Sequence, residues 1–203
     1  MSALRSGRQL VAAVRALVLA TVVLGLVYPL VMTGIAQVVR PGGADGSLVR
    51  SSSGQVVGSS LIGQSFTDSK GDPLAQYFQS RPSAGSYDGK ASGGSNLGPN
   101  SADLVKAISD RRAAVAAFDG VPESAVPADA VTASGSGLDP GISPAYAAIQ
   151  VQRVATARGA SAGDVQALVA GATHGRDLGF IGAPYVNVLE LNRALDQRFG
   201  TSG

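Results

Sequence analysis

Few residues of this chain are of types that do chemistry. Cysteine is absent and histidine occurs once, so a zinc site built from protein ligands is not expected. The single histidine, His174, lies in a glycine-flanked segment typical of a surface loop. No nucleophile-elbow, Walker or dinucleotide-binding sequence is present, and the acidic residues are scattered. Nothing in the residues argues for an enzyme, a metal or a cofactor.

Two glycine-rich stretches remain as candidates for binding a ligand. They are Ser92-Gly93-Gly94-Ser95-Asn96 and Ser134-Gly135-Ser136-Gly137. Backbone N–H groups in such loops can cradle an anion. Glycine also suits tight turns that need a positive φ, because it has no Cβ. The residues alone favour the turns and leave anion binding as the alternative.

An apolar segment near the N-terminus is the element expected to position the rest of the chain. Ala16 to Val39 contains no charged residue, and a helix of that length spans the roughly 30 Å hydrocarbon core of a bilayer. A cleaved signal peptide has a shorter apolar region of about 7–15 residues. Gly34-Ile35-Ala36 is only a weak cleavage match, so a retained transmembrane helix is favoured. Pro29 is tolerated in such helices.

Charge flanking the apolar segment predicts its orientation. Arg5, Arg8 and Arg15 precede it, and Arg40 alone follows it. The positive-inside bias then places the N-terminus in the cytoplasm and residues 41–203 outside. We therefore expect a single-pass protein of the cell membrane. Residues 1–40 form the cytoplasmic end and the span, and residues 41–203 form one extracytoplasmic domain.

The basic residues beyond the span give no sign of nucleic-acid binding. Residues 41–203 carry 12 Lys and Arg against 14 Asp and Glu, a net charge near −2. The longest basic run among them is the Arg111-Arg112 pair. Nucleic-acid-binding domains instead gather basic residues on one face, so no nucleic-acid partner is expected.

The outer domain has an α+β pattern, with short strands before about four helices. Short apolar pieces predict strands at Leu48–Arg50, Gln55–Val57, Leu61–Ile62 and Leu178–Ile181. Residues 67–100 have the composition of a long loop. Capping and stop residues predict helices from near Ser101 to Gly120, from Ser143 to Gly159, from Ser161, and from Asn187. The apolar stripes expected to be buried are Leu104, Ile108, Val115 and Phe118, and Val188, Leu191, Leu195 and Phe199.

Sequence blocks along almost the whole chain resemble the KdpC family, which supplies one of the subunits of the Kdp-type potassium-transporting ATPase. Several such blocks in the same order are specific, although any one alone would be weak. The matching stretches are Tyr28-Pro29-Leu30, Gly58 to Gln64 with Phe66, Tyr77-Phe78, Arg81-Pro82-Ser83, Ala91 to Gly98, Val131 to Pro140, Ile142-Ser143-Pro144, Arg153-Val154-Ala155, Ala157-Arg158 and Val186 to Asn192.

The resemblance implies an accessory role in a potassium pump. Its partners would be a channel-like potassium-conducting subunit, a P-type ATPase subunit and a small single-span subunit. The family is described as assisting assembly and ATP binding by the ATPase subunit, with ATP as a ligand. The family's proposed nucleotide contact falls on Gln150, and the Ser92–Asn96 loop is likened to a transporter-ATPase signature loop. Gln152 stands where the family commonly has proline.

An alternative function follows from the predicted topology. The charge bias places Gln150 outside, whereas ATP is hydrolysed in the cytoplasm. An outer domain would instead cover or shape the potassium entrance without touching nucleotide. Asp129 and Asp139 are candidates for such an entrance because carboxylate oxygens suit hard cations. We favour a turn role for Asp139, in the Asp-Pro turn before the helix at Ser143.

Small residues in the span suggest where a partner helix docks. Gly25, Tyr28, Pro29 and Gly34 lie within the apolar segment. Small residues let helix backbones approach closely in lipid. We hypothesise that this part of the span docks on a partner subunit.

The predicted topology is tested by labelling single cysteines, which the cysteine-free chain makes unique. In intact spheroplasts, Ser202→Cys should react with an impermeant maleimide, and Ser2→Cys should react only after lysis. The reverse pattern would refute the outside location and revive a direct role with cytoplasmic ATP.

Overall fold

The computed structural model describes residues 2–51 and 53–200 of the 203-residue chain. The chain divides into two compact units, Met1–Ser47 and Leu48–Gly203. The sequence-based boundary between residues 40 and 41 stays a prediction. Each unit is described by itself below.

The first unit is a long helix whose middle is widened ahead of a proline. It runs through α1 (Ser2–Val22), a π-helical turn η1 (Val23–Val27) and α2 (Tyr28–Val39), and the short α3 (Pro41–Ala44) follows. In the wide turn the Tyr28 N–H donates to the carbonyl of Val23, five residues back. A proline in a helix has no N–H and crowds the carbonyl four residues before it. The wide turn lets the helix continue past Pro29.

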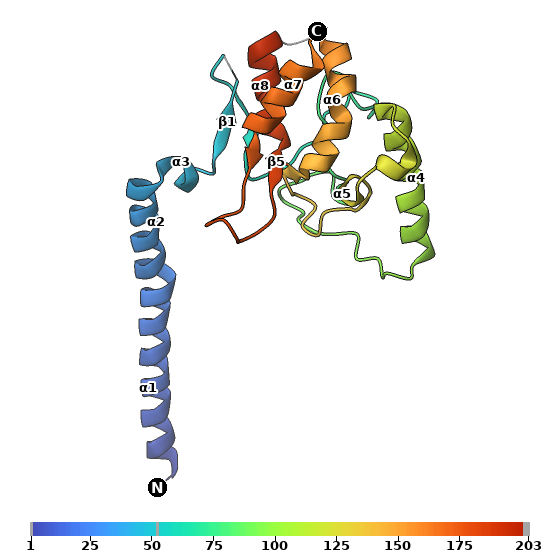
Figure 1. The fold of residues 1–203 in the computed structure, drawn as a ribbon. Coiled ribbons are helices and arrows are strands. Elements are labelled where there is room, and N and C mark those ends of the chain that lie inside the picture. Colours follow the sequence, from blue (N-terminus) through green and yellow to red (C-terminus); the bar gives the residue numbers. More distant parts are fainter. Residues whose placement is uncertain (1, 52, 201–203) are drawn as a thin grey trace. The chain divides into compact units, whose positions relative to one another are not determined.

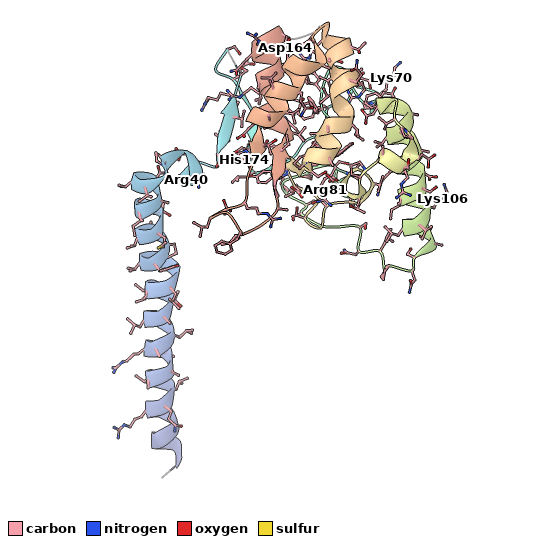
Figure 2. All side chains as sticks on the ribbon, in the orientation of Figure 1. Arg40, Lys70, Arg81, Lys106, Asp164 and His174 are labelled. Carbon is pink, nitrogen blue, oxygen red and sulfur yellow. The ribbon has the colours of Figure 1, made fainter. Side chains whose placement is uncertain are left out.

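One helix in the described part of the chain, Gly7–Val39, is long and apolar enough to cross a membrane. Its side chains project on all sides of the ribbon (Figure 2), and nearly all of them are exposed. A helix that is apolar around its whole circumference is suited to a lipid environment. This agrees with the predicted transmembrane segment.

The second unit combines short strands with several helices (Figure 1), which confirms the predicted α+β class. Its elements are β1 (Leu48–Arg50), β2 (Val56–Ser59), α4 (Ala102–Asp119), η2 (Glu123–Ala125), α5 (Ala128–Val131), β3 (Gly141–Ile142), α6 (Pro144–Arg158), α7 (Ala162–Gly171), β4 (Thr173–His174), β5 (Tyr185–Asn187) and α8 (Val188–Phe199). β1 and β2 form an antiparallel hairpin. The other strands form an antiparallel sheet in the order β3-β5-β4.

The three predicted helix caps are confirmed. The side chain of Ser143 accepts a hydrogen bond from the Tyr146 N–H, and Ser161 accepts one from Asp164. Asn187 accepts one from the Glu190 N–H at the start of α8. Each bond satisfies an N–H that has no partner inside its helix.

A single core joins the helices to the three-stranded sheet. α6 packs against both α7 and α4, while α8 packs against α7 and β5. The predicted α8 stripe is confirmed, with Phe199 partly buried at its end. The α4 stripe is only partly buried, and Ala116 and Asp119 face the core more fully. The fully buried large side chains include Phe78, Ile142, Leu191, Leu195, Val154, Val165 and Val186.

Two strand predictions are wrong. Leu61–Ile62 lies in a turn, where the Ile62 N–H donates to Ser59, and the chain then passes directly against residues 138–139. Leu178–Ile181 is also not a strand, because residues 178–180 form the turn between paired Asp177 and Ile181. Both pieces are apolar and short. In pieces this short, the spacing of apolar residues does not distinguish a strand from an apolar turn.

Candidate functional site

The two glycine-rich loops pack against each other, backbone to backbone. The Gly93 N–H donates to the Ser136 carbonyl at 2.8 Å, and the Ser92 hydroxyl donates to the same oxygen at 3.0 Å. A Cβ on Gly94 would lie 3.0 Å from the Gly135 oxygen, and one on Gly137 would lie 2.6 Å from the Gly93 oxygen. This close approach accounts for Gly94 and Gly137 without a ligand, whereas a Cβ on Gly93 or Gly135 would meet nothing within 4 Å. The N–H of Gly93 is already used within the protein.

Ser95 and Asn96 complete the first loop and are exposed. Asn96 has a φ of 53°, which asparagine tolerates better than most side chains. Among the described residues, no hydrogen bond links this loop to Gln150. The structure therefore brings the two glycine-rich loops together but leaves Gln150 separate from them.

Asp139 organises the turn before β3. Its Oδ1 accepts from the Gly141 N–H at 2.9 Å, and its Oδ2 accepts from Nη1 of Arg81 at 2.9 Å. Nη2 of Arg81 donates onward to the Thr132 carbonyl at 3.3 Å. Both carboxylate oxygens of Asp139 thus have partners inside the domain.

Gln150 lies on α6 and is fully buried, with 0% of its surface exposed. Its Oε1 accepts from the Gln79 N–H at 2.7 Å, and its Nε2 donates to the Gln79 carbonyl at 3.2 Å. The side-chain amide therefore pairs with both polar backbone groups of one residue, as a neighbouring β-strand would. In this conformation no ligand in solvent reaches the Gln150 side chain.

Asn192, on α8, makes the same pairing with the adjacent residue. Its Oδ1 accepts from the Phe78 N–H at 2.9 Å, and its Nδ2 donates to the Phe78 carbonyl at 3.0 Å. Asn192 is 1% exposed and Phe78 is 0% exposed. Side chains of α6 and α8 thus bind the backbone of two consecutive residues, in a segment that forms neither helix nor strand.

Two arginines of α6 complete this arrangement. Nη1 of Arg153 donates to the carbonyls of Ala75 and Tyr77, at 2.6 and 3.0 Å. Nε of Arg158 donates to the Gln76 carbonyl at 2.8 Å. We call Ala75–Gln79 the clamped segment, because side chains from α6 and α8 bind the backbone of every one of its residues.

Arg153 also connects the clamped segment to α4. Its Nε pairs with Oδ1 of Asp119 at 2.7 Å, its Nη2 donates to Oε1 of Gln150 at 2.8 Å, and its guanidinium stacks over the Phe118 ring. Burial raises the pKa of the Asp119 carboxyl, although the Arg153 charge opposes this effect. All three guanidinium nitrogens of Arg153 are therefore occupied inside the domain.

The second arginine forms a similar group near the end of α8. Nη2 of Arg158 pairs with Oδ1 of Asp196 at 2.7 Å, and its guanidinium lies 4.7 Å from the Tyr77 ring centroid. The Tyr77 hydroxyl donates to Asp196 at 3.2 Å. Burial and the nearby Asp196 charge raise the pKa of Tyr77.

Four side chains of α6 and α8 bind the clamped segment, and only Gln150 was identified as a site residue from the sequence. The other three are Arg153, Arg158 and Asn192. The available signal was a polar residue placed on an apolar helix face. Asn192 directly follows buried Leu191 and lies three residues before buried Leu195. Buried amides and guanidiniums need partners, but the sequence does not say which backbone supplies them.

The proposed docking residues lie around the widened turn of the first unit. Gly25 is inside the turn, and Tyr28 and Pro29 begin α2. Gly34 comes nine residues after Gly25, which in a regular helix puts the two residues on roughly opposite sides. The wide turn makes the angle between their directions smaller. A Cβ on Gly25 would meet only Thr21 at 4.0 Å, and one on Gly34 would meet nothing within 4 Å. Gly25, Tyr28 and Pro29 therefore share one side more closely than Gly34 does.

The fold and the clamp define a class of protein: a small α+β domain, joined to one helix able to span a membrane, whose polar motif residues bind its own backbone. The family described as "K+-transporting ATPase, c chain" matches residues 10–197. This chain belongs to that family.

Relatives agree with this assignment over most of their length. The "Potassium-transporting ATPase KdpC subunit" of Kineococcus radiotolerans is 58% identical over 181 residues, covering 88% of each chain. The proteins of the same name from Beijerinckia indica and Caulobacter vibrioides are 54% and 52% identical, over 90% and 88% of each chain. The resemblance inferred from the sequence blocks is thus confirmed.

The packing of the glycine-rich loops predicts that replacing glycine with alanine destabilises the domain at some positions and not at others. Gly137→Ala should lower the free energy of unfolding by about 2 kcal/mol or more, because φ is 68° and the Cβ meets the Gly93 oxygen. Gly98→Ala is the matched control, since a Cβ there meets nothing within 4 Å. Thermal unfolding of the full chain in detergent measures both. Equal melting temperatures for the two variants would contradict the packing role.

Proposed function

We propose that this chain is a non-catalytic subunit of a potassium-transporting ATPase complex that assists assembly of the pump. In this proposal the span anchors the subunit, with the N-terminus in the cytoplasm and the domain outside. The domain presents a fixed surface to its partners. Assistance to ATP binding by the P-type ATPase subunit then follows from correct assembly rather than from nucleotide contact.

The observation that carries this proposal is the position of Gln150. The residue expected to touch nucleotide is 0% exposed, and its amide binds the backbone of Gln79 and the guanidinium of Arg153. Freeing the amide for a ligand would leave two backbone groups of the clamped segment without partners. An unsatisfied backbone group costs about 1–3 kcal/mol when it is fully buried, and the two Gln79 groups are partly buried. The geometry therefore supports a structural role for Gln150.

The partners in this proposal are the channel-like potassium-conducting subunit, the P-type ATPase subunit and the small single-span subunit. The side of the span around Gly25 and Pro29 supports docking within the membrane. Gly25 has no side chain that would keep a neighbouring helix away. In the wide turn, the Tyr28 N–H bonds to a carbonyl five residues back instead of four.

The second candidate function is an outer domain that shapes the potassium entrance without touching nucleotide. It is supported by the charge bias around the span, which predicts that the domain lies outside. The Asp139 carboxylate is a weak basis for it, because both of its oxygens bind groups of the domain. Any contribution to the entrance would then depend on where the whole domain docks.

Replacement of Gln150 separates a structural role from nucleotide contact. Gln150→Ala should destabilise the full chain by about 2 kcal/mol, because two partly buried backbone groups of Gln79 lose their partners. The yield of purified complex should fall, while the KM for ATP of the complex that does assemble should stay normal. Gln152→Ala, on the exposed side of α6, is the matched control and should change neither quantity. Normal stability and yield with a raised KM for ATP would refute the structural role.

Bulk added at Gly25 tests docking within the membrane. Gly25→Leu should reduce recovery of the other subunits on affinity purification without reducing membrane insertion, because the new side chain keeps a partner helix away. Val23→Phe adds bulk on the far side of the same wide turn and should be tolerated. Full recovery of the complex with Gly25→Leu would place the docking surface elsewhere.

A further inference from the structure

A cavity of the domain lies beside the clamped segment, and Gln150 is not among the residues that line it. It has a volume of about 560 Å³ and is lined by the β1–β2 hairpin, the chain around residues 64–67 and 74–77, and α8. The β1–β2 hairpin lies next to α8 (Figure 1), because a Cβ on Gly58 of β2 would lie 2.9 Å from Leu189 of α8. The cavity is large enough for a small ligand.

The walls of this cavity combine apolar and polar groups. Phe66, Leu74, Tyr77 and Leu189 supply apolar surface, whereas Ser65 and Thr67 supply hydroxyl groups. Arg193 and Asp196 of α8 are the charged residues that line it. A ligand that fits these walls has an apolar body and a polar head.

Arg193 differs from Arg153 and Arg158 in the hydrogen bonds of its guanidinium group. Arg153 and Arg158 have acceptors for all of their guanidinium nitrogens. Nε of Arg193 is shielded from water and has no acceptor, and no carboxylate of a described residue lies within 4 Å of its guanidinium. A buried donor without an acceptor is uncommon in folded proteins and calls for an explanation.

Among the described residues that line the cavity, the acid is Asp196, and it is already paired. Asp196 pairs with Arg158 at 2.7 Å and also accepts the Tyr77 hydroxyl. With this pair cancelled, the charge left at the cavity is the positive charge of Arg193. A partly desolvated guanidinium pairs best with carboxylate or phosphate.

We propose that this cavity binds an amphipathic anion, a carboxylate or phosphate group carried on an apolar body, with Arg193 pairing with the anionic head. The head lies at α8, and the body lies along Phe66, Leu74 and Leu189. Two sources supply this chemistry: an anionic phospholipid of the membrane that anchors the chain, or a soluble acyl carboxylate.

The test uses the full chain in a neutral detergent, with octanoate as the soluble probe and calorimetry as the readout. Octanoate should bind, and acetate, which has the same head without the body, should bind at least about tenfold more weakly. Arg193→Gln should weaken octanoate binding by about tenfold or more. Arg198→Gln, an equal charge change at an exposed position of the same helix, should leave it unchanged.

The source is distinguished by native mass spectrometry with phosphatidylglycerol and phosphatidylcholine. Loss of retained phosphatidylglycerol in Arg193→Gln, but not in Arg198→Gln, assigns the site to a lipid. Unchanged lipid retention with lost octanoate binding assigns it to a soluble anion.

A structural role for Arg193 is tested in the same samples. Without ligand, Arg193→Gln should keep the wild-type melting temperature, because the Arg193 side chain forms no ion pair with a described residue and its Nε has no acceptor. Arg193→Lys should retain more octanoate binding than Arg193→Gln. The proposal is overturned if wild type binds neither probe or if Arg193→Gln binds both like wild type. It is also overturned if the ligand-free melting temperature of Arg193→Gln falls by several degrees.

Discussion

The fixed structure of the domain depends on the buried guanidinium of Arg153. It pairs with Asp119 at the end of α4, with Gln150 on its own helix, and with two carbonyls of the clamped segment. The side chains of Arg153 and Asp119 are only 7% and 2% exposed. Removing one partner from such a pair leaves an unpaired buried charge, at a cost of about 3–5 kcal/mol. One side chain thus makes the positions of α4, α6 and the clamped segment interdependent.

The clamped segment shows how a long connection without regular structure is held in place. Between β2 and α4 the described residues form no helix and no extended strand. Amide and guanidinium side chains from α6 and α8 take over the role that a neighbouring strand would have in a sheet. The motif residues Gln150, Arg153 and Asn192 all serve this purpose. The same residue types that suit a nucleotide site here bind backbone groups that are buried at Phe78 and partly buried at Tyr77 and Gln79.

The sequence was sufficient for features whose partners are near in the chain. Ser143, Ser161 and Asn187 cap helices by binding N–H groups three residues away, so their spacing identified the helices. The sheet β3-β5-β4 and the clamped segment depend on contacts between distant residues, such as Phe78 with Asn192, 114 positions apart. No local pattern specifies such contacts. Gln150 was singled out through resemblance, but only the structure shows which backbone it binds.

Amide hydrogen exchange in the clamped segment of the full chain tests the structural role most directly. If Gln150 and Asn192 hold this segment, the N–H groups of Phe78 and Gln79 should exchange as slowly as those in the middle of α6. Addition of ATP should leave their rates unchanged. Rapid exchange at Phe78 and Gln79, or protection that appears only with ATP, would contradict an internal clamp and favour a nucleotide site at Gln150.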